Sequence, residues 1–360
     1  MAVAFCMSGL GALGRLAWPT DPGAFRLWLA LVVVFHHLTR IEVGKAPVLV
    51  FFALSGYWVH RVWRQQYALT RWPLLTFMVS RWWRIAPVLL LASAICVPLL
   101  WVNLDPDASL VAASPLRQLF SAAAIFGYAL LPTRPVGPAW SLDIEMQFYL
   151  IAPLLIAGVR RLAPGLVLAL GFAVFVVAMA FGAGVTLPSF LPFFLIGMVA
   201  AEHNWRPDPR LAHGGLGLAV GLTCLAVAFP AGASLITEGG AHAAVFNLVL
   251  GMLAMPFALM TVVRRGDRTD AMFADQSYLV YMLHWPAIAL LRHSIWPAWL
   301  GVGGAALGLG AGVAVGCALV WRWLDQPLNQ RRKQWVRKRM RKAKESGDSA
   351  KGGDTAALLA

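Results

Sequence analysis

The sequence predicts an all-α membrane protein, a polytopic bundle of about ten transmembrane helices. Of its 360 residues, 59% are hydrophobic and only 13% are charged. Soluble domains carry about 45–50% apolar and about 25% charged residues. An apolar excess of this size suits a bilayer, and the sixteen tryptophans fit as well, because tryptophan collects at membrane–water boundaries. We therefore predict a membrane-embedded chain rather than a soluble domain.

Ten apolar stretches are long enough to cross the hydrocarbon core, or nearly so, since a spanning helix needs about 20 residues. They run over 24–41, 46–63, 82–102, 143–159, 163–181, 187–201, 211–231, 242–263, 275–292 and 298–323. An eleventh stretch, 116–131, is apolar but weak. The number of spans is therefore ten or eleven, and charge decides between the two.

Basic residues gather in five segments outside the predicted spans. These segments are 61–84, 160–161, 206–210, 264–268 and the tail 331–360. Loops rich in Lys and Arg stay in the cytoplasm. With ten spans, and with 103–142 as one external segment that holds a re-entrant or surface helix, all five segments fall on the same side. The sequence thus predicts ten spans in a cell's inner (cytoplasmic) membrane, with both termini in the cytoplasm.

The chain is predicted to have three parts: a short N-terminal segment over 1–23, a transmembrane domain over 24–330 and a tail over 331–360. The tail holds ten Lys or Arg and three Asp or Glu, which supply +7 of the total charge of +14. Such a tail could bind nucleic acid. Basic residues that follow a last span also serve as a cytoplasmic anchor, so we expect no nucleic-acid partner. Beyond Lys344 the tail is small and polar and is predicted to be disordered. No signal peptide is expected before the first span.

The four cysteines are widely scattered, and their spacing indicates neither a disulfide framework nor a zinc site. We therefore predict no bound metal.

Ionisable residues inside a span are costly and are candidates for function. The first span holds Arg26 near its inner end and His36 and His37 near its outer end. Arg26 and His37 are eleven residues apart, so on a helix they share one face, about 16 Å apart along the axis. His36 lies about 80° away from that line. An Arg and a His aligned on one membrane helix favour a functional role.

The second and third spans hold further polar residues. Ser55 and Gly56 are small, and close helix packing is a sufficient reason for such a pair. Arg81 and Arg84 are three residues apart and project from one side of the third helix. The guanidinium fork suits phosphate oxygens. Ordinary cytoplasmic flanking charge explains these two arginines equally well.

The segment 137–153 carries the densest set of polar residues. Trp140 and Ser141 stand where an external loop enters the fifth span. Asp143 could cap the N-terminus of that helix. Glu145 lies further in and needs a partner, for which a histidine is suitable.

Near the end of the chain, Ser277, Tyr278, Tyr281 and His284 form a polar stripe on one helix. Hydrogen bonds between helices are the ordinary reason for such a stripe. The last span is predicted to close at Pro327, before the basic tail.

Six motifs follow one another in order. They are Arg26 with ten residues before His37, PVLVFFALSG (47–56), SRWWRIAP (80–87), AWSLDIEMQFYLIAP (139–153), LPFFLIGM (191–198) and SYLVYMLHWP (277–286). Together they resemble the acyltransferase-3 family of membrane O-acyltransferases, which includes bacterial O-antigen and exopolysaccharide acetylases. Two departures stand out. His36 beside His37 leaves open which histidine acts, and Asp325-Gln326-Pro327 stands where a Glu-Arg-Pro-like sequence is common.

The resemblance implies an acyl-CoA donor, such as acetyl-CoA, on the cytoplasmic side and a carbohydrate or lipid-linked glycan as the acceptor, with no permanently bound cofactor. A histidine suits the base that acyl transfer to a hydroxyl needs. We therefore expect His37 to deprotonate the acceptor and Glu145 to orient His37. Arg81 and Arg84 would hold the phosphates of CoA, and Arg26 would lie along the donor's path.

A proton-coupled transporter is the alternative function, with His37, Glu145 and His284 as a proton relay. Such transporters often contain inverted repeats with broken helices in matching halves. We find no such repeat in the sequence, so the acyltransferase is the favoured prediction.

The topology can be tested by cysteine labelling in intact cells. A cysteine introduced at Arg160 should resist a membrane-impermeant reagent added from outside, because 160–161 is predicted to be cytoplasmic. A cysteine introduced within 103–142 serves as the accessible control. Labelling at position 160 from outside would rule out the ten-span arrangement.

Overall fold

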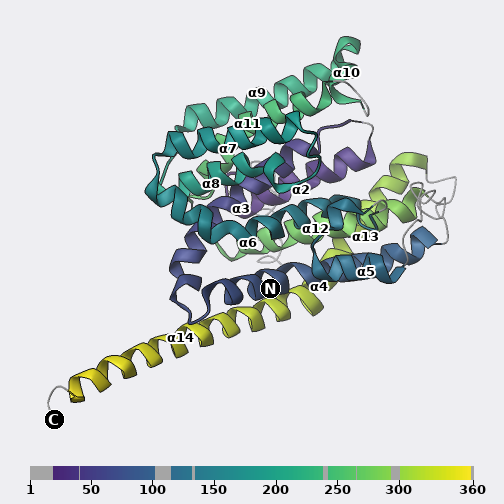
Figure 1. Cartoon of the computed structure of the whole chain (residues 1–360). Helices are drawn as coiled ribbons and strands as arrows, with labels where there is room; N and C mark the ends of the chain where they lie inside the picture. The colour runs from purple at the N-terminus through teal and green to yellow at the C-terminus, as the bar shows by residue number, and fades with distance from the viewer. Residues whose placement is uncertain are drawn as a thin grey trace, which may run out of the picture.

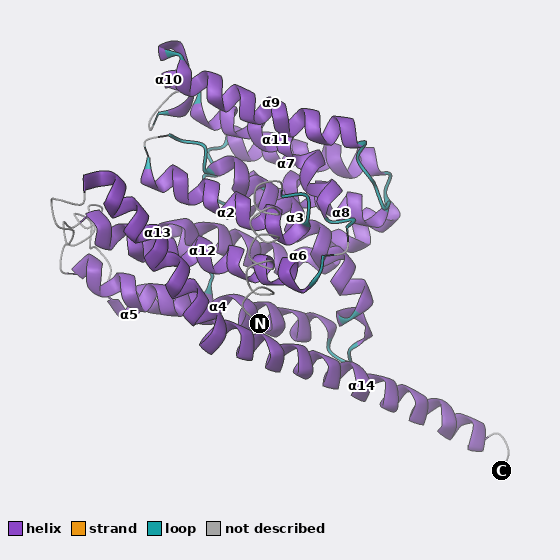
Figure 2. Cartoon of the chain, turned by 180° about the vertical axis from the view of Figure 1, so that it is seen from behind, coloured by secondary structure: helices purple, strands orange, loops and turns teal. Residues whose placement is uncertain are grey.

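Helices make up nearly the whole of the described chain. The computed structural model describes residues 19–39, 41–101, 115–131, 134–237, 242–264, 266–292 and 301–357. Within these ranges no strand occurs, and the only extended pairing is an isolated bridge between Ile41 and Thr237. Figure 2 shows helices joined by short loops. The predicted all-α class is confirmed.

Each predicted span corresponds to a helix. These are α2 (Pro22–Leu38), α3 (Lys45–Gln65), α4 (Pro73–Trp101), α6 (Trp140–Arg161), α7 (Pro164–Ala180), α8 (Leu191–Glu202), α9 (Pro209–Ala228), α11 (Ala243–Thr261), α12 (Arg268–Arg292) and α13 (Gly301–Val320). Five described helical segments are long and apolar enough to cross a membrane by length and composition alone. Three others, among them the 12-residue α8, are apolar but shorter. The helical membrane bundle is therefore established, and the number of spans stays a prediction.

The weak stretch 116–131 does not form a spanning helix. Its helical part is α5 (Pro115–Ala124), whose 10 residues extend only about 15 Å. This short helix lies against α4, where the indole of Trp82 donates a hydrogen bond to the carbonyl of Ala123 at 2.6 Å. A short helix thus occurs within the predicted external segment 103–142, of which 102–114 lies outside the described residues, and its surface or re-entrant placement stays a prediction.

Proline and aspartate set several helix starts. Helices α2, α7 and α9 have Pro22, Pro164 and Pro209 in their first turns. A backbone N–H in the first turn has no partner within the helix, so proline costs no hydrogen bond there. Asp208 caps α9 by accepting hydrogen bonds from the backbone N–H groups of Arg210 and Leu211. Such starts are readable from the sequence, and α2, α7 and α9 begin close to the predicted positions. Helices α4 and α12, by contrast, begin at Pro73 and Arg268, well before the predicted spans 82–102 and 275–292.

Helices α3 and α8 pack closely because glycine lies at their crossing. A Cβ atom on Gly56 would overlap the carbonyl oxygen of Phe194, and one on Gly197 would overlap the carbonyl oxygen of Ala53. The two backbones therefore touch, as small residues permit in membrane helices. The packing interpretation of Gly56 is confirmed, whereas its neighbour Ser55 faces a cavity described below.

The C-terminal helices differ from the prediction. The last span does not close at Pro327, because α13 continues through a π-helical turn, η8 (Trp321–Asp325), into α14 (Gln326–Ala357). Pro327 lies in the first turn of α14, where a proline is tolerated. The residues beyond Lys344, predicted to be disordered, continue this helix to Ala357. Lys and Arg are strong helix formers, and Arg341 pairs with Glu345 one turn later. Figure 1 shows α14 leaving the bundle and extending well beyond it.

Candidate functional site

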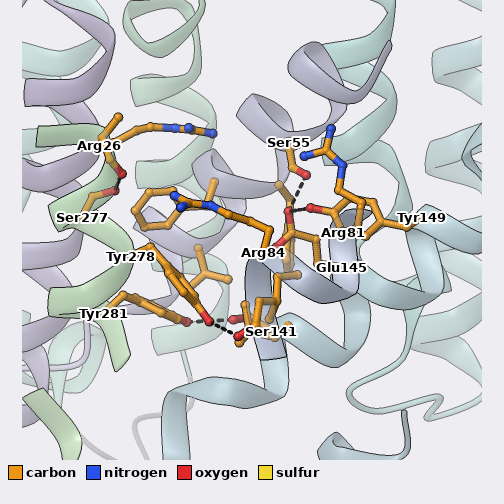
Figure 3. A pocket seen from close by; sticks show the side chains of 16 residues that line it. Arg26, Ser55, Arg81, Arg84, Ser141, Glu145, Tyr149, Ser277, Tyr278 and Tyr281 are labelled. Atoms are coloured by element: carbon orange, nitrogen blue, oxygen red, sulfur yellow. Dashed lines mark hydrogen bonds between the residues drawn. The ribbon is translucent and has the colours of Figure 1, made fainter. Parts of the chain in front are cut away.

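A cavity of about 170 Å³ lies among five helices, and we call it the arginine cavity. Helices α2, α3, α4, α6 and α12 each contribute polar side chains to its wall. They are Arg26, Ser55, Arg81, Arg84, Ser141, Glu145, Tyr149, Ser277, Tyr278 and Tyr281. Figure 3 shows the guanidinium group of Arg26 reaching in from one side and the group of Ser55, Glu145 and Tyr149 on the other. Eight of the predicted site residues therefore meet in one place, together with Tyr149 and Tyr278.

Arg81 and Arg84 lie inside helix α4 rather than in a loop before it. Helix α4 begins at Pro73, so the two arginines lie two to three turns inside it. The side chain of Arg84 is only 22% exposed. A buried guanidinium needs compensation, and the two arginines obtain it in different ways.

Arg84 is held by two carboxylates from other helices. Its Nη2 atom lies 3.1 Å from an oxygen of Asp275, and its Nη1 atom lies 3.2 Å from an oxygen of Asp325. Asp325 is 4% exposed and also accepts a hydrogen bond from Asn329 at 2.9 Å. Sequence reasoning missed both carboxylates as site residues. The only available signal was a charged residue at the edge of an apolar stretch.

Arg26 and Arg81 have no carboxylate partner among the described residues. The Nε atoms of both are buried and donate no hydrogen bond within that part of the chain. The guanidinium of Arg81 instead lies over aromatic rings, 5.1 Å from the centroid of Phe77 and 5.3 Å from that of Tyr149. Two arginines therefore remain available to an anionic ligand, whereas Arg84 is already neutralised.

Glu145 is the one carboxylate in the wall of the arginine cavity. The hydroxyl of Ser55 donates to it at 2.6 Å, and the hydroxyl of Tyr149, one turn along α6, donates to the same oxygen. The sequence led us to expect Glu145 beside His37. In the structure Glu145 is bound by Ser55 and Tyr149 instead, and His36 and His37 line a second cavity, described below. Tyr149 was not predicted, although its position four residues after Glu145 on one helical face was readable.

Asp143 does not cap α6. Its carboxylate instead accepts hydrogen bonds from the backbone N–H of Ala129 at 2.9 Å and from the side chain of Gln147 at 3.0 Å. The side chain is fully buried. It therefore fixes the loop after α5 against the start of α6, which is a structural role.

The second cavity measures about 960 Å³, and we call it the histidine cavity. His36, His37, Lys45, Arg134, Trp140 and Trp285 line it, with many apolar side chains between them. It is formed by the ends of α2, α7 and α12 and the starts of α3, α6, α8 and α11. Because neighbouring helices run in opposite directions, these ends share one level of the bundle, away from the N-terminal end of α2 that holds Arg26.

The histidines form a stacked group. The ring of His37 lies 5.4 Å from that of His284 and 5.0 Å from that of Trp285. His284 is fully buried; its Nδ1 atom lies 2.8 Å from the carbonyl oxygen of Val280, and its Nε2 atom is buried without a partner. His36 lies 4.6 Å from His37, and its Nδ1 atom lies 3.0 Å from the carbonyl of Ile41. A carbonyl at Nδ1 leaves the Nε2 of a neutral histidine as an acceptor.

The two cavities share a wall. Val48 and Tyr281 line both of them. The hydroxyl of Tyr281 lies 2.9 Å from that of Ser141, and both hydroxyls donate to the carbonyl of Pro138 at 3.1 Å. Figure 3 shows this contact at the edge of the arginine cavity. Ser277, by contrast, donates back to Ala274 within its own helix.

Metal ligands are not grouped in the parts of the chain that the structure describes. No set of three or more His, Cys, Asp or Glu side chains there could hold a metal ion.

Comparison with known proteins finds one relationship. The family described as an acyltransferase domain, Acyl_transf_3, matches residues 20–321, which is most of the chain. No curated protein and no solved structure matches. The matched range contains both cavities.

The ion cluster around Arg84 should stabilise the fold. Replacing Asp325 by Ala leaves a buried arginine with one remaining, partly exposed partner, and breaking a buried pair typically costs about 3–5 kcal/mol. We expect Asp325→Ala to lower the thermal unfolding temperature clearly in detergent. Asp275→Ala should do so less, because the side chain of Asp275 is 34% exposed. If both substitutions lower the unfolding temperature only slightly and by the same amount, the ion cluster contributes little to the stability of the fold.

Proposed function

Because the chain belongs to the acyltransferase-3 family, we propose that it transfers an acyl group from acyl-CoA to a hydroxyl of a cell-envelope or extracellular carbohydrate, in the inner membrane of its cell. Acetyl is the acyl group proposed. The family supports a membrane acyltransferase in general, and the donor and acceptor are argued below from the two cavities.

The observation that carries the proposal is the pair of cavities with one shared wall. The arginine cavity holds Arg26 and Arg81, which have no carboxylate partner among the described residues, against the carboxylate of Glu145, while Arg84 is paired with Asp275 and Asp325. Its excess of positive charge suits an anionic donor, since guanidinium groups bind phosphate oxygens well. The histidine cavity offers bases at the other level of the bundle. In the predicted topology the first cavity faces the cytoplasm, where acyl-CoA is made, and the second faces outward.

The proposed reaction takes place at the shared wall. His37 removes the proton of the acceptor hydroxyl, and the hydroxyl oxygen attacks the carbonyl carbon of the thioester. The bond from carbon to sulfur then breaks, and the thiolate of CoA takes the proton back from the imidazolium of His37. The hydroxyls of Tyr281 and Ser141 lie where the two substrates would meet, and once they turn away from the carbonyl of Pro138 they can donate to the oxyanion of the intermediate. Their contact must open for the thioester to reach His37.

Glu145 has a different proposed role from the one inferred from the sequence. Its hydrogen bonds from Ser55 and Tyr149 hold it in the wall of the arginine cavity. There its charge balances Arg26 and Arg81 while the donor is absent. In this proposal the ring of His284, which stacks on the ring of His37, keeps the imidazole of His37 in position.

Purified protein supplied with labelled acetyl-CoA tests the reaction class. The proposal expects release of CoA and movement of the label to an envelope glycan fraction. Solute flux driven by a pH gradient, without thioester turnover, would favour the transporter instead.

Donor binding should depend on the arginines that lack a carboxylate. We expect Arg81→Gln to weaken binding of acetyl-CoA about tenfold or more, since a hydrogen bond to a charged group contributes about 1.5–3 kcal/mol. The readout is equilibrium binding to folded protein in detergent. Arg206→Gln, an exposed arginine in the loop after α8, is the matched control. Unchanged affinity in Arg81→Gln would return Arg81 to a packing role.

The base should be His37 rather than His36. Loss of a general base typically costs about 10²–10⁴-fold in rate, so we expect a decrease of that size in His37→Ala. His36→Ala should be milder, because His36 lies about 80° away from the helical face that His37 shares with Arg26. The measurement is acyl transfer per mole of folded, membrane-inserted protein. The reverse order of the two variants would assign the base to His36, and full activity in the double variant would exclude both.

A further inference from the structure

The wall of the histidine cavity offers few partners to a polyhydroxylated ligand. Most of its lining side chains are apolar, including Phe175, Phe190, Phe193 and Leu248. No carboxylate lines it among the described residues. The amide of Asn247 is already occupied, because it accepts from Ala46 and donates to the carbonyls of Glu42 and Ala243. A free sugar chain would leave many hydroxyls without a hydrogen bond, and each one would lose its solvation.

The cavity reaches the lipid-facing surface of the bundle. Met179 of α7 and Val245 of α11 line the cavity and are also 47% and 61% exposed. The outer faces of the same two helices carry further exposed apolar side chains, among them Val177 and Val249. In a membrane bundle such faces contact acyl chains. A ligand can therefore lie in the cavity while its hydrocarbon part stays in the bilayer.

Two cations accompany the apolar wall. Lys45 is the first residue of α3 and is exposed, and Arg134 is half-buried before α6. Both belong to the level of the bundle where the helices end, which is the depth of lipid headgroups in the predicted topology. With no carboxylate in the wall, these side chains favour an anionic group such as a phosphate.

Two polar atoms in this wall have no partner. Ser189 Oγ and the indole Nε1 of Trp285 are buried without a hydrogen bond in the described chain. The Trp285 ring lies 5.0 Å from the ring of His37. A buried N–H donor such as the indole of Trp285 is normally paired. A ligand hydroxyl next to His37 would accept the hydrogen bond that this indole can donate.

From these observations we infer that the histidine cavity binds an anionic lipid carrying the acceptor hydroxyl, with its phosphate between Lys45 and Arg134 and its chain leaving past Met179 and Val245. This inference rests on the proposed function for the identity of the acceptor, but not for the binding itself. It restricts the acceptor to a lipid-borne molecule and excludes a free polysaccharide.

The binding can be tested without the reaction. The full-length protein in phosphatidylcholine vesicles is exposed to a dodecyl phosphate that carries a photoreactive diazirine at the chain end, and labelled peptides are located by mass spectrometry. We expect labelling on α7 and α11, at least tenfold above that by the matching dodecyl alcohol. Lys45→Gln combined with Arg134→Gln should remove this difference.

Two variants on one helix locate the opening. Val245→Trp should block it and reduce labelling at least fivefold, whereas Val249→Trp, one turn away and outside the cavity, should not. Equal labelling by phosphate and alcohol would overturn the inference. So would equal effects of the two tryptophans, or competition by inorganic phosphate as strong as by unlabelled dodecyl phosphate. Acetyl transfer by the wild-type protein is measured separately, so that a failed reaction and a failed binding site are distinguished.

Discussion

Arg84 lies in the wall of the arginine cavity, and the arrangement of its partners determines the rest of the site. A charge at membrane depth is costly unless it is paired. Arg84 of α4 is paired with Asp275 of α12 and with Asp325 in the π-helical turn after α13. This cluster connects three helices that are distant in sequence. Because it neutralises Arg84, it leaves Arg26 and Arg81 as the cations of the arginine cavity that a ligand can use.

The same cluster continues toward the basic helix α14. Asn329 donates to Asp325, and the guanidinium of Arg332 contacts Asn329 at 3.3 Å and the hydroxyl of Ser80 at 2.9 Å. Buried hydrogen bonds of this kind strengthen one another in a low dielectric. The first turns of α14 therefore belong to the wall that supports the arginines, while its later turns extend away from the bundle (Figure 1).

Much of the fold was readable from the sequence, since hydropathy, proline and charge mark helices and their ends. Helical periodicity also places Arg26 and His37 on one face of the first helix, and in the structure Arg26 lines the arginine cavity and His37 the histidine cavity. The side chains that these polar residues contact on other helices could not be read from the sequence. Glu145 pairs with Ser55, which lies 90 residues away, and Arg84 pairs with Asp325, 241 residues away. Periodicity says which face a residue occupies on its own helix, but not which helix faces it. The end of the last span was missed because a π-helical turn precedes Pro327 and lets the helix continue.

The central claim is that an acyl group passes from the arginine cavity to the histidine cavity through the wall at Val48 and Tyr281. Inside-out membrane vesicles from cells that make the acceptor test it most directly. Labelled acetyl-CoA is added outside, on the cytoplasmic face, and the label on the acceptor is then challenged with an added esterase before and after permeabilisation. The account predicts label that resists the esterase until the vesicles are opened. Label that is removed at once would place the product on the donor side and contradict the account.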